Sequence, residues 1–366
     1  MEKIGGTFFM NVAVGMSGGV DSAVAAVILK DQGYDVIGIS MAVWDGSVTC
    51  VPAKRHACYG PDEKEDIREA ERVCSRIGIP FHVFDCSKEY RRTVVEYFKN
   101  EYRSARTPNP CVVCNQRVKF DALLREAKAS GVSFDIFATG HYARTVVDRG
   151  SGRVLLMKGM DRKKDQSYFL YRLSQAQLAG IRFPLGDLSK EHVRAIARLH
   201  GLEVSDKEES QDFYCGDYRE LLDAEDCSGD IVLGSGEVVG RHNGLWNYTP
   251  GQRRGLGVAY AEPLYVVKLD AGTNSVIVGT KEDMAVSSFA VNDCNWIAVE
   301  RPAASFRARV KIRSSQQEMA ASVEVAGEGE VHVTLLDARE AVSPGQSAVF
   351  YNGDIVIGGG IIDRTL

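Results

Sequence analysis

Short apolar runs alternate with amphipathic stretches along the first two hundred residues. We predict strands at residues 11–16, 36–41, 81–84 and 136–141, and helices at residues 22–30, 63–77, 88–102 and 118–129. Strands that alternate with helices in this way predict a doubly wound α/β domain around a parallel sheet. Ligands of such domains bind at the carboxyl ends of the strands, so these ends are where functional residues are expected.

The pattern changes after about residue 201. Residues 203–285 are rich in glycine and polar residues, and they predict short mixed elements without a clean period. At residues 306–313 apolar and basic residues alternate strictly, which predicts a strand with one buried face and four cations on the other. Further strands at 331–336, 347–351 and 355–362 indicate a small closed barrel. The predicted domains are therefore residues 8–202, 203–285 and 286–366.

The composition of the 366-residue chain, 45% hydrophobic and 25% charged, is that of an ordinary globular protein. No apolar run is long enough for a bilayer, and residues 1–6 lack the apolar core of a signal peptide, so we expect a cytoplasmic protein without a membrane partner. The net charge of -5 means that nucleic acid would need a local basic surface. The alternating strand could supply it, although a solvated edge strand has the same pattern.

A turn between the first strand and the first helix has the features of an anion site. It reads Ser17-Gly18-Gly19-Val20-Asp21-Ser22. The glycines let the backbone approach an anion, and the start of the helix offers free N–H groups. Asp21 suits a role in binding Mg²⁺ or in positioning the loop. The loop lacks the lysine of a P-loop and the glycine spacing of a dinucleotide fold, and a glycine-rich turn without ligand is the alternative.

This hexapeptide resembles the PP-loop of the ATP pyrophosphatases, which adenylate a carbonyl or amide oxygen. The resemblance implies that ATP phosphates are held by Gly15, Met16, Ser17, Gly18, Gly19, Val20, Asp21 and Ser22. It also implies that Met41 and Gly140, each at the end of a later strand, border the adenine and the ribose. The expected fold is a doubly wound, parallel-sheet PP-loop ATP pyrophosphatase domain, followed by a small mixed central domain and a C-terminal β-barrel.

Five further segments, at residues 106–115, 163–170, 212–216, 249–257 and 344–351, make the resemblance more specific. With the PP-loop they resemble the tRNA-specific 2-thiouridylases over nearly the whole chain. That family replaces the 2-oxygen of the wobble uridine in tRNA with sulfur. The resemblance implies that ATP adenylates this oxygen, that Mg²⁺ and the loop stabilise the departing pyrophosphate, and that a thiolate-borne sulfur then attacks. The base must first leave its stack.

The roles of individual residues are carried over from the family by position. Cys114 would be the nucleophile and Cys215 the persulfide carrier, with a disulfide between them after turnover. Asn109, Pro110 and Cys111 would border the target base. The expected tRNA contacts are Lys164, Asp165 and Gln166, with His141, Arg313, Ser314 and Gln346 nearby. The partners implied are tRNA and a sulfur donor, which could be a cysteine desulfurase, a sulfur-relay protein or sulfide.

Cys111 departs from the family, because many members have an aspartate at this position. Cys111, Cys114 and Cys215 together could hold a [4Fe–4S] cluster with one iron open for sulfur. The rival interpretation is a persulfide and disulfide relay with Cys111 as a supporting thiol. Other cysteines are expected to be structural: Cys74 and Cys86 in the core, and Cys50, Cys58, Cys227 and Cys294 in structural or surface positions.

Two other functions remain open on the residues alone. One is a PP-loop synthetase that adenylates a small-molecule carboxylate or carbonyl, which would need neither Cys114 nor Cys215. The other is an iron–sulfur or sulfur-carrier protein in which ATP is regulatory, which would release no pyrophosphate.

Overall fold

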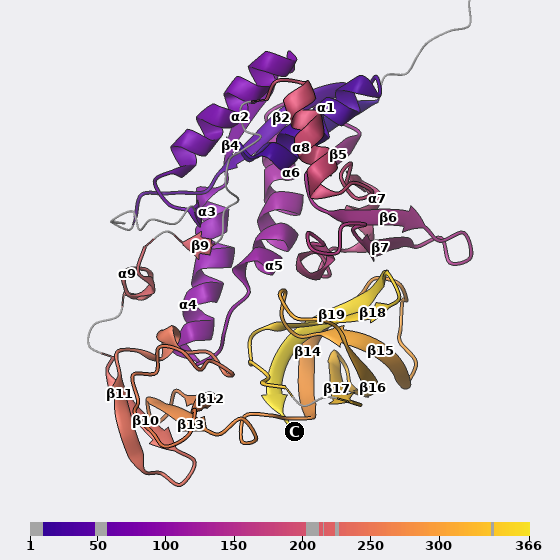
Figure 1. Cartoon of the computed structure of the whole chain (residues 1–366). Coiled ribbons are helices and arrows are strands. Elements are labelled where there is room, and N and C mark those ends of the chain that lie inside the picture. Colours follow the sequence, from indigo (N-terminus) through magenta and orange to yellow (C-terminus); the bar gives the residue numbers. More distant parts are fainter. Residues whose placement is uncertain (1–9, 48–56, 203–211, 215, 224–226, 338–339) are drawn as a thin grey trace, which may run out of the picture. The chain divides into compact units, whose positions relative to one another are not determined.

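The computed structural model describes residues 10–47, 57–202, 212–214, 216–223, 227–337 and 340–366 (Figure 1). The chain divides into two compact units. The first unit comprises residues 1–47, 51–91 and 114–215, and the second comprises residues 48–50, 92–113 and 216–366. Within the described ranges, none of the helices combines the length and the apolar character needed to cross a membrane.

A five-stranded parallel sheet forms the centre of the first unit. Its strands are β1 (Asn11–Gly15), β2 (Asp35–Ala42), β4 (Phe81–Asp85), β5 (Ile136–Thr139) and β8 (Ile181–Arg182). They lie in the order β4-β2-β1-β5-β8, and every pairing is parallel. The chain moves outward from β1 to β4 and then returns to the other side of β1 with β5. The predicted doubly wound sheet is confirmed, and its switch point lies between β1 and β5.

Helices α1 (Val20–Asp31), α2 (Glu63–Ile77) and α8 (Lys190–Leu199) pack beside the sheet, with α1 in contact with both others (Figure 1). Helix α1 consists mainly of alanine and valine and is buried on most sides, because it lies between the sheet and its neighbours. Two antiparallel strands, β6 (Ala143–Val147) and β7 (Val154–Lys158), follow β5. A short parallel pair joins β3 (Ala57–Tyr59) to β9 (Asp212–Tyr214). Helix α7 (Gln175–Ala179) precedes β8.

Two helical runs contain π-helical turns. The first comprises α3 (Ser87–Tyr90), a π-helical segment (Arg91–Val95) and α4 (Glu96–Arg103). The second comprises α5 (Pro110–Cys114), a π-helical segment (Asn115–Ala122) and α6 (Leu123–Ala129). The sequence predicted a helix only from residue 118, because Pro110 was interpreted as part of a stiff turn. Proline suits the first helical position, so the helix begins at Pro110 and includes Cys111 and Cys114.

The second unit contains a small sheet and a closed barrel. The sheet has the order β11-β10-β13-β12 and is preceded by a short helix, α9 (Tyr218–Leu222). Its strands are β10 (Gly229–Leu233), β11 (Val238–His242), β12 (Tyr265–Asp270) and β13 (Ser275–Gly279). The barrel strands are β14 (Ser288–Trp296), β15 (Ser305–Lys311), β16 (Met319–Gly327), β17 (Glu330–Leu335), β18 (Ser347–Asn352) and β19 (Ile355–Thr365). They pair in the order β14-β17-β16-β15-β18-β19, and β19 pairs back with β14, which confirms the predicted barrel.

The alternating strand at residues 306–313 is shorter than the sequence predicted. Strand β15 ends at Lys311, with Val310 buried in the barrel core and Arg307 and Arg309 exposed. Arg313 lies beyond the strand, and its guanidinium group donates hydrogen bonds to protein oxygens. The prediction of four cations on one face of this strand is therefore wrong for Arg313.

Candidate functional site

A cavity of about 340 Å³ lies in the first unit, where the loops after β1, β2 and β5 meet. The loop after β1 contributes residues 15–17 and 19–22, β2 contributes Met41, and the end of β5 contributes Thr139, Gly140 and His141. Gly140 permits the close approach of two of these loops, because a side chain there would lie 2.6 Å from the carbonyl carbon of Asp21. The cavity therefore lies at the switch point of the sheet.

The loop after β1 is braced by its own serines. The backbone N–H of Ser17 donates to Ser22 Oγ over 3.2 Å, and Ser22 Oγ donates to the carbonyl of Gly19 over 3.0 Å. Gly19 precedes helix α1 and offers no side-chain cap. The first N–H groups of α1 therefore remain open for an anion. Gly18 does not line the cavity, since it packs against the backbone of α2 at Asp66.

Asp21 is linked to two residues that the sequence did not single out. Lys190 Nζ donates to both carboxylate oxygens of Asp21 over 2.8 Å, and the Tyr142 hydroxyl donates to one of them over 2.9 Å. Lys190 is the first residue of α8 and is buried. An ionised carboxylate has about four acceptor positions, so Asp21 retains capacity for a metal ion. One carboxylate beside bound phosphates is a donor set that suits Mg²⁺.

Two more carboxylates line the cavity, Glu63 and Asp66. Glu63 is buried and accepts hydrogen bonds from the N–H groups of Val43 and Trp44, over 2.7 and 3.0 Å. Burial raises the pKa of Glu63. These contacts fasten the segment after β2 to the start of α2.

Cys114 is half-buried at the end of α5. Burial raises the pKa of its thiol to about 11, while the nearby charge of Lys119 acts in the opposite direction. His141 Nδ1 lies 2.7 Å from Thr139 Oγ1. Burial, and secondarily Lys119, lowers the pKa of His141 well below its usual value. His141 is therefore neutral at pH 7, which suits a positioned polar group better than a cationic RNA contact.

The three cysteines proposed for catalysis differ in whether the structure describes them and in how exposed they are. Cys111 is exposed on the first turn of α5, three residues before Cys114. Cys215 lies outside the described residues, as does Cys50. No disulfide joins any two of the seven cysteines within the described ranges, and no group of three metal-ligating side chains occurs there. The described residues thus supply two of the three thiolates that a cluster would need.

The other cysteines have the following positions. Cys74 and Cys86 are buried, and burial raises the pKa of each to about 12, in keeping with the predicted core roles. Cys58, expected in a structural or surface position, is exposed on β3 and lines the cavity. Cys227 and Cys294 are partly exposed.

The 163–170 segment contributes one residue to the cavity. Gln166 lines it, and the Tyr142 N–H donates to Gln166 Oε1 over 3.0 Å. Asp165 accepts hydrogen bonds from the N–H groups of Gly159 and Ser167, so it braces its own turn. Lys164 is partly exposed.

The predicted base-pocket segment belongs to the second unit and is held by the barrel. Gln346 Nε2 donates to the carbonyls of Thr107 and Pro108, over 3.2 and 2.9 Å. Arg106 pairs with Glu101 and with Asp363 of β19, over 2.9 and 3.2 Å. These contacts fix the chain immediately before Asn109, Pro110 and Cys111.

Arg313 faces protein rather than solvent. Its guanidinium group donates to the Ser343 hydroxyl over 2.8 Å and also to the carbonyl of Pro250. It therefore ties the 249–257 segment to the barrel. Ser314, next in the chain, is exposed.

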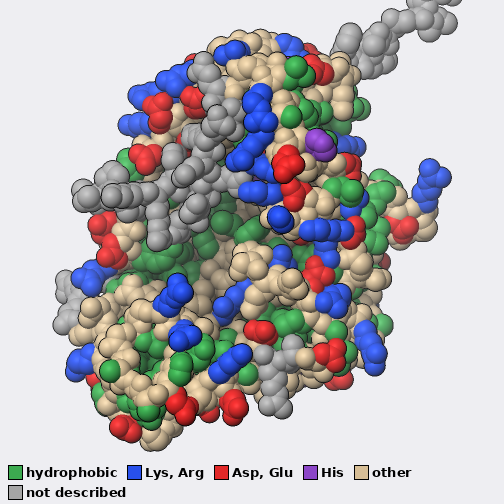
Figure 2. All heavy atoms as spheres, viewed as in Figure 1, with side chains coloured by type: hydrophobic (Ala, Val, Ile, Leu, Met, Phe, Trp, Pro, Cys, Tyr) green, Lys and Arg blue, Asp and Glu red, His purple; other side chains and the backbone are tan. Residues whose placement is uncertain are grey.

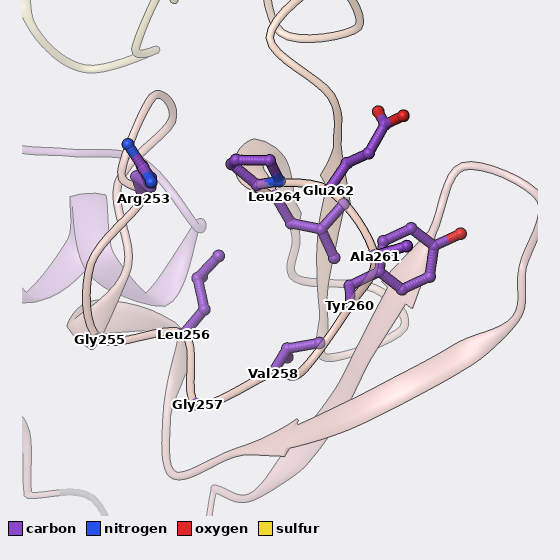
Figure 3. Close-up of a pocket in the computed structure, with 10 residues that line it drawn as sticks. Arg253, Gly255, Leu256, Gly257, Val258, Tyr260, Ala261, Glu262 and Leu264 are labelled. Carbon is purple, nitrogen blue, oxygen red and sulfur yellow. The ribbon is translucent and has the colours of Figure 1, made fainter.

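A second cavity, of about 420 Å³, is formed by residues 253–264 of the second unit (Figure 3). Arg253 and Glu262 lie on opposite sides of this hollow, and Leu256 and Val258 lie below it. No residue that the sequence predicted as a site residue lines it. Figure 2 shows Lys and Arg interspersed with Asp and Glu among the described residues of the visible face.

Comparisons with known proteins cover nearly the whole chain. Residues 10–215 match the tRNA methyl transferase HUP domain, residues 220–280 the tRNA methyl transferase PRC-barrel domain, and residues 286–362 the aminomethyltransferase β-barrel domain. A tRNA-specific 2-thiouridylase MnmA of Endomicrobium trichonymphae is 45% identical over 96% of this chain and 99% of its own. The protein of that name from Geobacter metallireducens is 45% identical over 97% of both chains. That from Syntrophotalea carbinolica is 46% identical over 96% of this chain and 98% of its own.

Proposed function

This chain belongs to the family of tRNA-specific 2-thiouridylases, and on that premise we propose that it is an ATP-dependent tRNA-uridine 2-sulfurtransferase. The observation that carries the proposal is the cavity at the switch point of the sheet. It joins an open helix N-terminus and the Asp21 carboxylate to His141 and Gln166, which come from two other segments. The family's chemistry requires a nucleotide site with such anion-binding groups.

In the proposed first step, ATP lies in the cavity with its terminal phosphates at the start of α1. Met41 and Gly140 border the adenosine. The target base leaves its stack and is bordered by Asn109, Pro110 and Cys111. The uridine 2-oxygen attacks the α-phosphorus, and the bond from that phosphorus to the bridging oxygen breaks. Pyrophosphate leaves, stabilised by the loop N–H groups. Mg²⁺, when held by Asp21, would supply further charge compensation for the phosphates.

In the proposed second step, the terminal sulfur of a Cys215 persulfide attacks C2 of the base, and AMP leaves with the former 2-oxygen. The Cys114 thiolate then attacks the Cys215 sulfur. The bond between the two sulfurs breaks, the base retains one of them, and a Cys114–Cys215 disulfide forms. A thiol reductant reopens this disulfide, and a cysteine desulfurase or a sulfur-relay protein then transfers persulfide sulfur to the Cys215 thiolate. If sulfide is the donor, it attacks the Cys215 sulfur of the disulfide instead, which leaves the persulfide on Cys215 and a thiolate on Cys114. We place the reaction in the cytoplasm.

The alternative for the second step uses Cys111, Cys114 and Cys215 as ligands of a [4Fe–4S] cluster, which would carry the transferred sulfur. The presence of Cys111 where many relatives have an acid favours this alternative. The division of the chain at residues 202 and 285 is part of the same proposal, with tRNA contacts in the central and C-terminal parts.

The proposal is tested by following pyrophosphate release with and without tRNA. The parent should release pyrophosphate only with tRNA present. Cys114→Ser should still adenylate the base but form no 2-thiouridine, while Asp21→Ala should release little pyrophosphate. Release that needs a small carboxylate instead of tRNA would favour a synthetase. Persulfide or cluster content without any pyrophosphate release would favour a sulfur carrier.

A further inference from the structure

The charges that line the nucleotide cavity are unbalanced. Three carboxylates line it, those of Asp21, Glu63 and Asp66. Among its described lining residues, the one Lys or Arg is Lys119. Lys190 lies close by but does not line the cavity, and its ammonium group donates to both oxygens of Asp21. A cavity that receives a polyanion therefore depends on Lys119 for a side-chain cation.

The fold brings Lys119 to this position through a π-helical turn. Lys119 follows Cys114 by five residues, inside the π-helical segment Asn115–Ala122. In a π-helix, hydrogen bonds join residues five apart, so residues at this spacing lie on one side. The N–H of Leu123, for example, donates to the carbonyl of Val118. An ordinary α-helix would align residues three or four apart and would turn Lys119 away from Cys114.

Lys119 acts electrostatically on both chemical groups of this region. Its charge lowers the pKa of the Cys114 thiol and the pKa of His141, in each case as a smaller effect beside burial. Lys119 is partly exposed and lines the cavity, so its ammonium group can meet a ligand bound there.

We propose that Lys119 binds the α-phosphate of ATP and stabilises the charge that develops there as pyrophosphate departs. This inference rests on the proposed function and adds a catalytic residue to it. The loop at the start of α1 is placed to hold the departing pyrophosphate. Lys119 arrives on the helix that bears Cys114, so it meets the phosphate at the reacting end of the nucleotide. A fixed cation beside developing charge is a strong source of rate acceleration.

The experiment compares the parent with Lys119→Gln, Lys119→Arg and Lys128→Gln. Lys128 is a matched control, because it is an exposed lysine on α6 of the same helical run and lies 5.2 Å from the Phe134 ring centre. Two quantities are measured: the affinity for ATP and the rate of tRNA-dependent pyrophosphate release. Circular dichroism verifies that each variant is folded.

Lys119→Gln should slow pyrophosphate release about 10²- to 10³-fold, the loss typical for one charge-stabilising donor. It should also weaken ATP binding. Lys119→Arg should recover part of each loss because it keeps the charge, and Lys128→Gln should behave as the parent.

Parental rates of pyrophosphate release in Lys119→Gln would overturn the inference while leaving the thiolation proposal intact. If instead the parent itself proved inactive on tRNA, ATP affinity would still decide the matter. An unchanged affinity for ATP in Lys119→Gln would then overturn the inference, and a weakened affinity would support it.

Discussion

The Asp21 carboxylate connects the loop after β1 to two distant residues. It accepts two hydrogen bonds from Lys190 and one from Tyr142, and these partners follow it by 169 and 121 residues. The Lys190 side chain is 9% exposed and that of Asp21 is 25% exposed. Removing the carboxylate therefore takes the anionic partner Asp21 away from a buried cation, whereas removing the cation leaves an anion that water still reaches.

This asymmetry predicts which of two substitutions, Asp21→Asn or Lys190→Met, lowers the free energy of unfolding more. Asp21→Asn should lower the free energy of unfolding by about 2 kcal/mol, below the ~3–5 kcal/mol of a fully buried pair because water reaches Asp21. Lys190→Met should cost about 1 kcal/mol, and the double variant should be more stable than Asp21→Asn. Urea unfolding followed by circular dichroism measures all three. A larger loss for Lys190→Met than for Asp21→Asn would contradict this account.

His141 predicts a dependence of stability on pH. Its pKa in the folded protein lies well below the value of about 6.5 for an unfolded chain. Below pH 6.5 the unfolded chain binds a proton that the folded protein does not, so the folded state loses up to ~1.4 kcal/mol per pH unit. Above pH 6.5 neither the folded nor the unfolded state binds this proton, so His141 then causes no loss of stability. His141→Gln should remove this part of the decline between pH 6.5 and 5.

The control for this prediction is His82→Gln, because His82 is exposed on β4. Unfolding midpoints are compared for the three proteins across the same pH range. His82→Gln should retain the parental decline, and an equal decline in His141→Gln would show that another group causes it.

Among single residues, the sequence predicts those that belong to a local motif. Most of the loop at 15–22, together with Met41, Gly140, His141 and Gln166, lines one cavity. It does not predict Lys190, because a single lysine at the start of an amphipathic helix looks like a surface residue. It likewise gives no signal for Lys119, whose placement depends on a π-helical turn that no periodicity marks.

The helix that begins at Pro110 carries both cysteines of the 106–115 segment. Residues three apart on a helix share one face, so Cys111 and Cys114 can serve one ligand or one relay. The substitution Cys111→Asp restores the commoner family residue and separates the two chemistries.

If the thiols form a relay, Cys111→Asp should retain substantial activity, and a Cys114–Cys215 disulfide should accumulate after turnover. If they hold a cluster, the same variant should lose iron, sulfide and activity together, since two thiolates retain a [4Fe–4S] unit poorly. The assay combines anaerobic purification, iron and sulfide analysis, and thiolation with tRNA, ATP and either sulfide or a cysteine desulfurase with cysteine. An active, iron-free Cys111→Asp enzyme would exclude an obligatory three-cysteine cluster.

The contact between the barrel and the 106–108 segment predicts a positioning role for Gln346. A carboxylate cannot donate to the carbonyls of Thr107 and Pro108, so Gln346→Glu should loosen the segment before Asn109. We expect kcat for thiolation to fall about tenfold, equivalent to ~1.4 kcal/mol, with ATP affinity unchanged. Gln317→Glu, at an exposed position of the same barrel, is the control.

Weakened tRNA binding with parental kcat would show instead that Gln346 acts as a direct RNA contact. The variant Gln346→Asn, which keeps a donor on a shorter side chain, should then lie between the parent and Gln346→Glu in affinity rather than in kcat.

Elements with strong periodicity are the ones that the sequence predicts well. Helix α2 has the predicted bounds, and β1, β2, β4 and β5 lie within one or two residues of prediction. The β6 and β7 pair was not predicted, since both strands are short and partly exposed. Helix α8 was missed although its pattern is amphipathic. Strand β15 ends two residues early because Arg313 turns toward Ser343 and Pro250, a contact that depends on the tertiary structure.

At the scale of the whole molecule, the order of α/β domain, central sheet and barrel follows from the change of pattern along the sequence. The assignment of residues 92–113 to the second unit does not follow from that pattern, because it depends on contacts such as those of Arg106 with Asp363. The net charge of -5 and the mixed charges of the visible face mean that tRNA must be recognised locally.

The most direct test of the central claim is to quantify 2-thiouridine in tRNA by mass spectrometry after incubation with the protein, ATP and sulfide. The account predicts one 2-thiouridine per tRNA at the wobble position, with one AMP and one pyrophosphate formed for each. It predicts none without ATP and none with Cys114→Ser. An unmodified tRNA, or thiolation that proceeds without ATP, would contradict it.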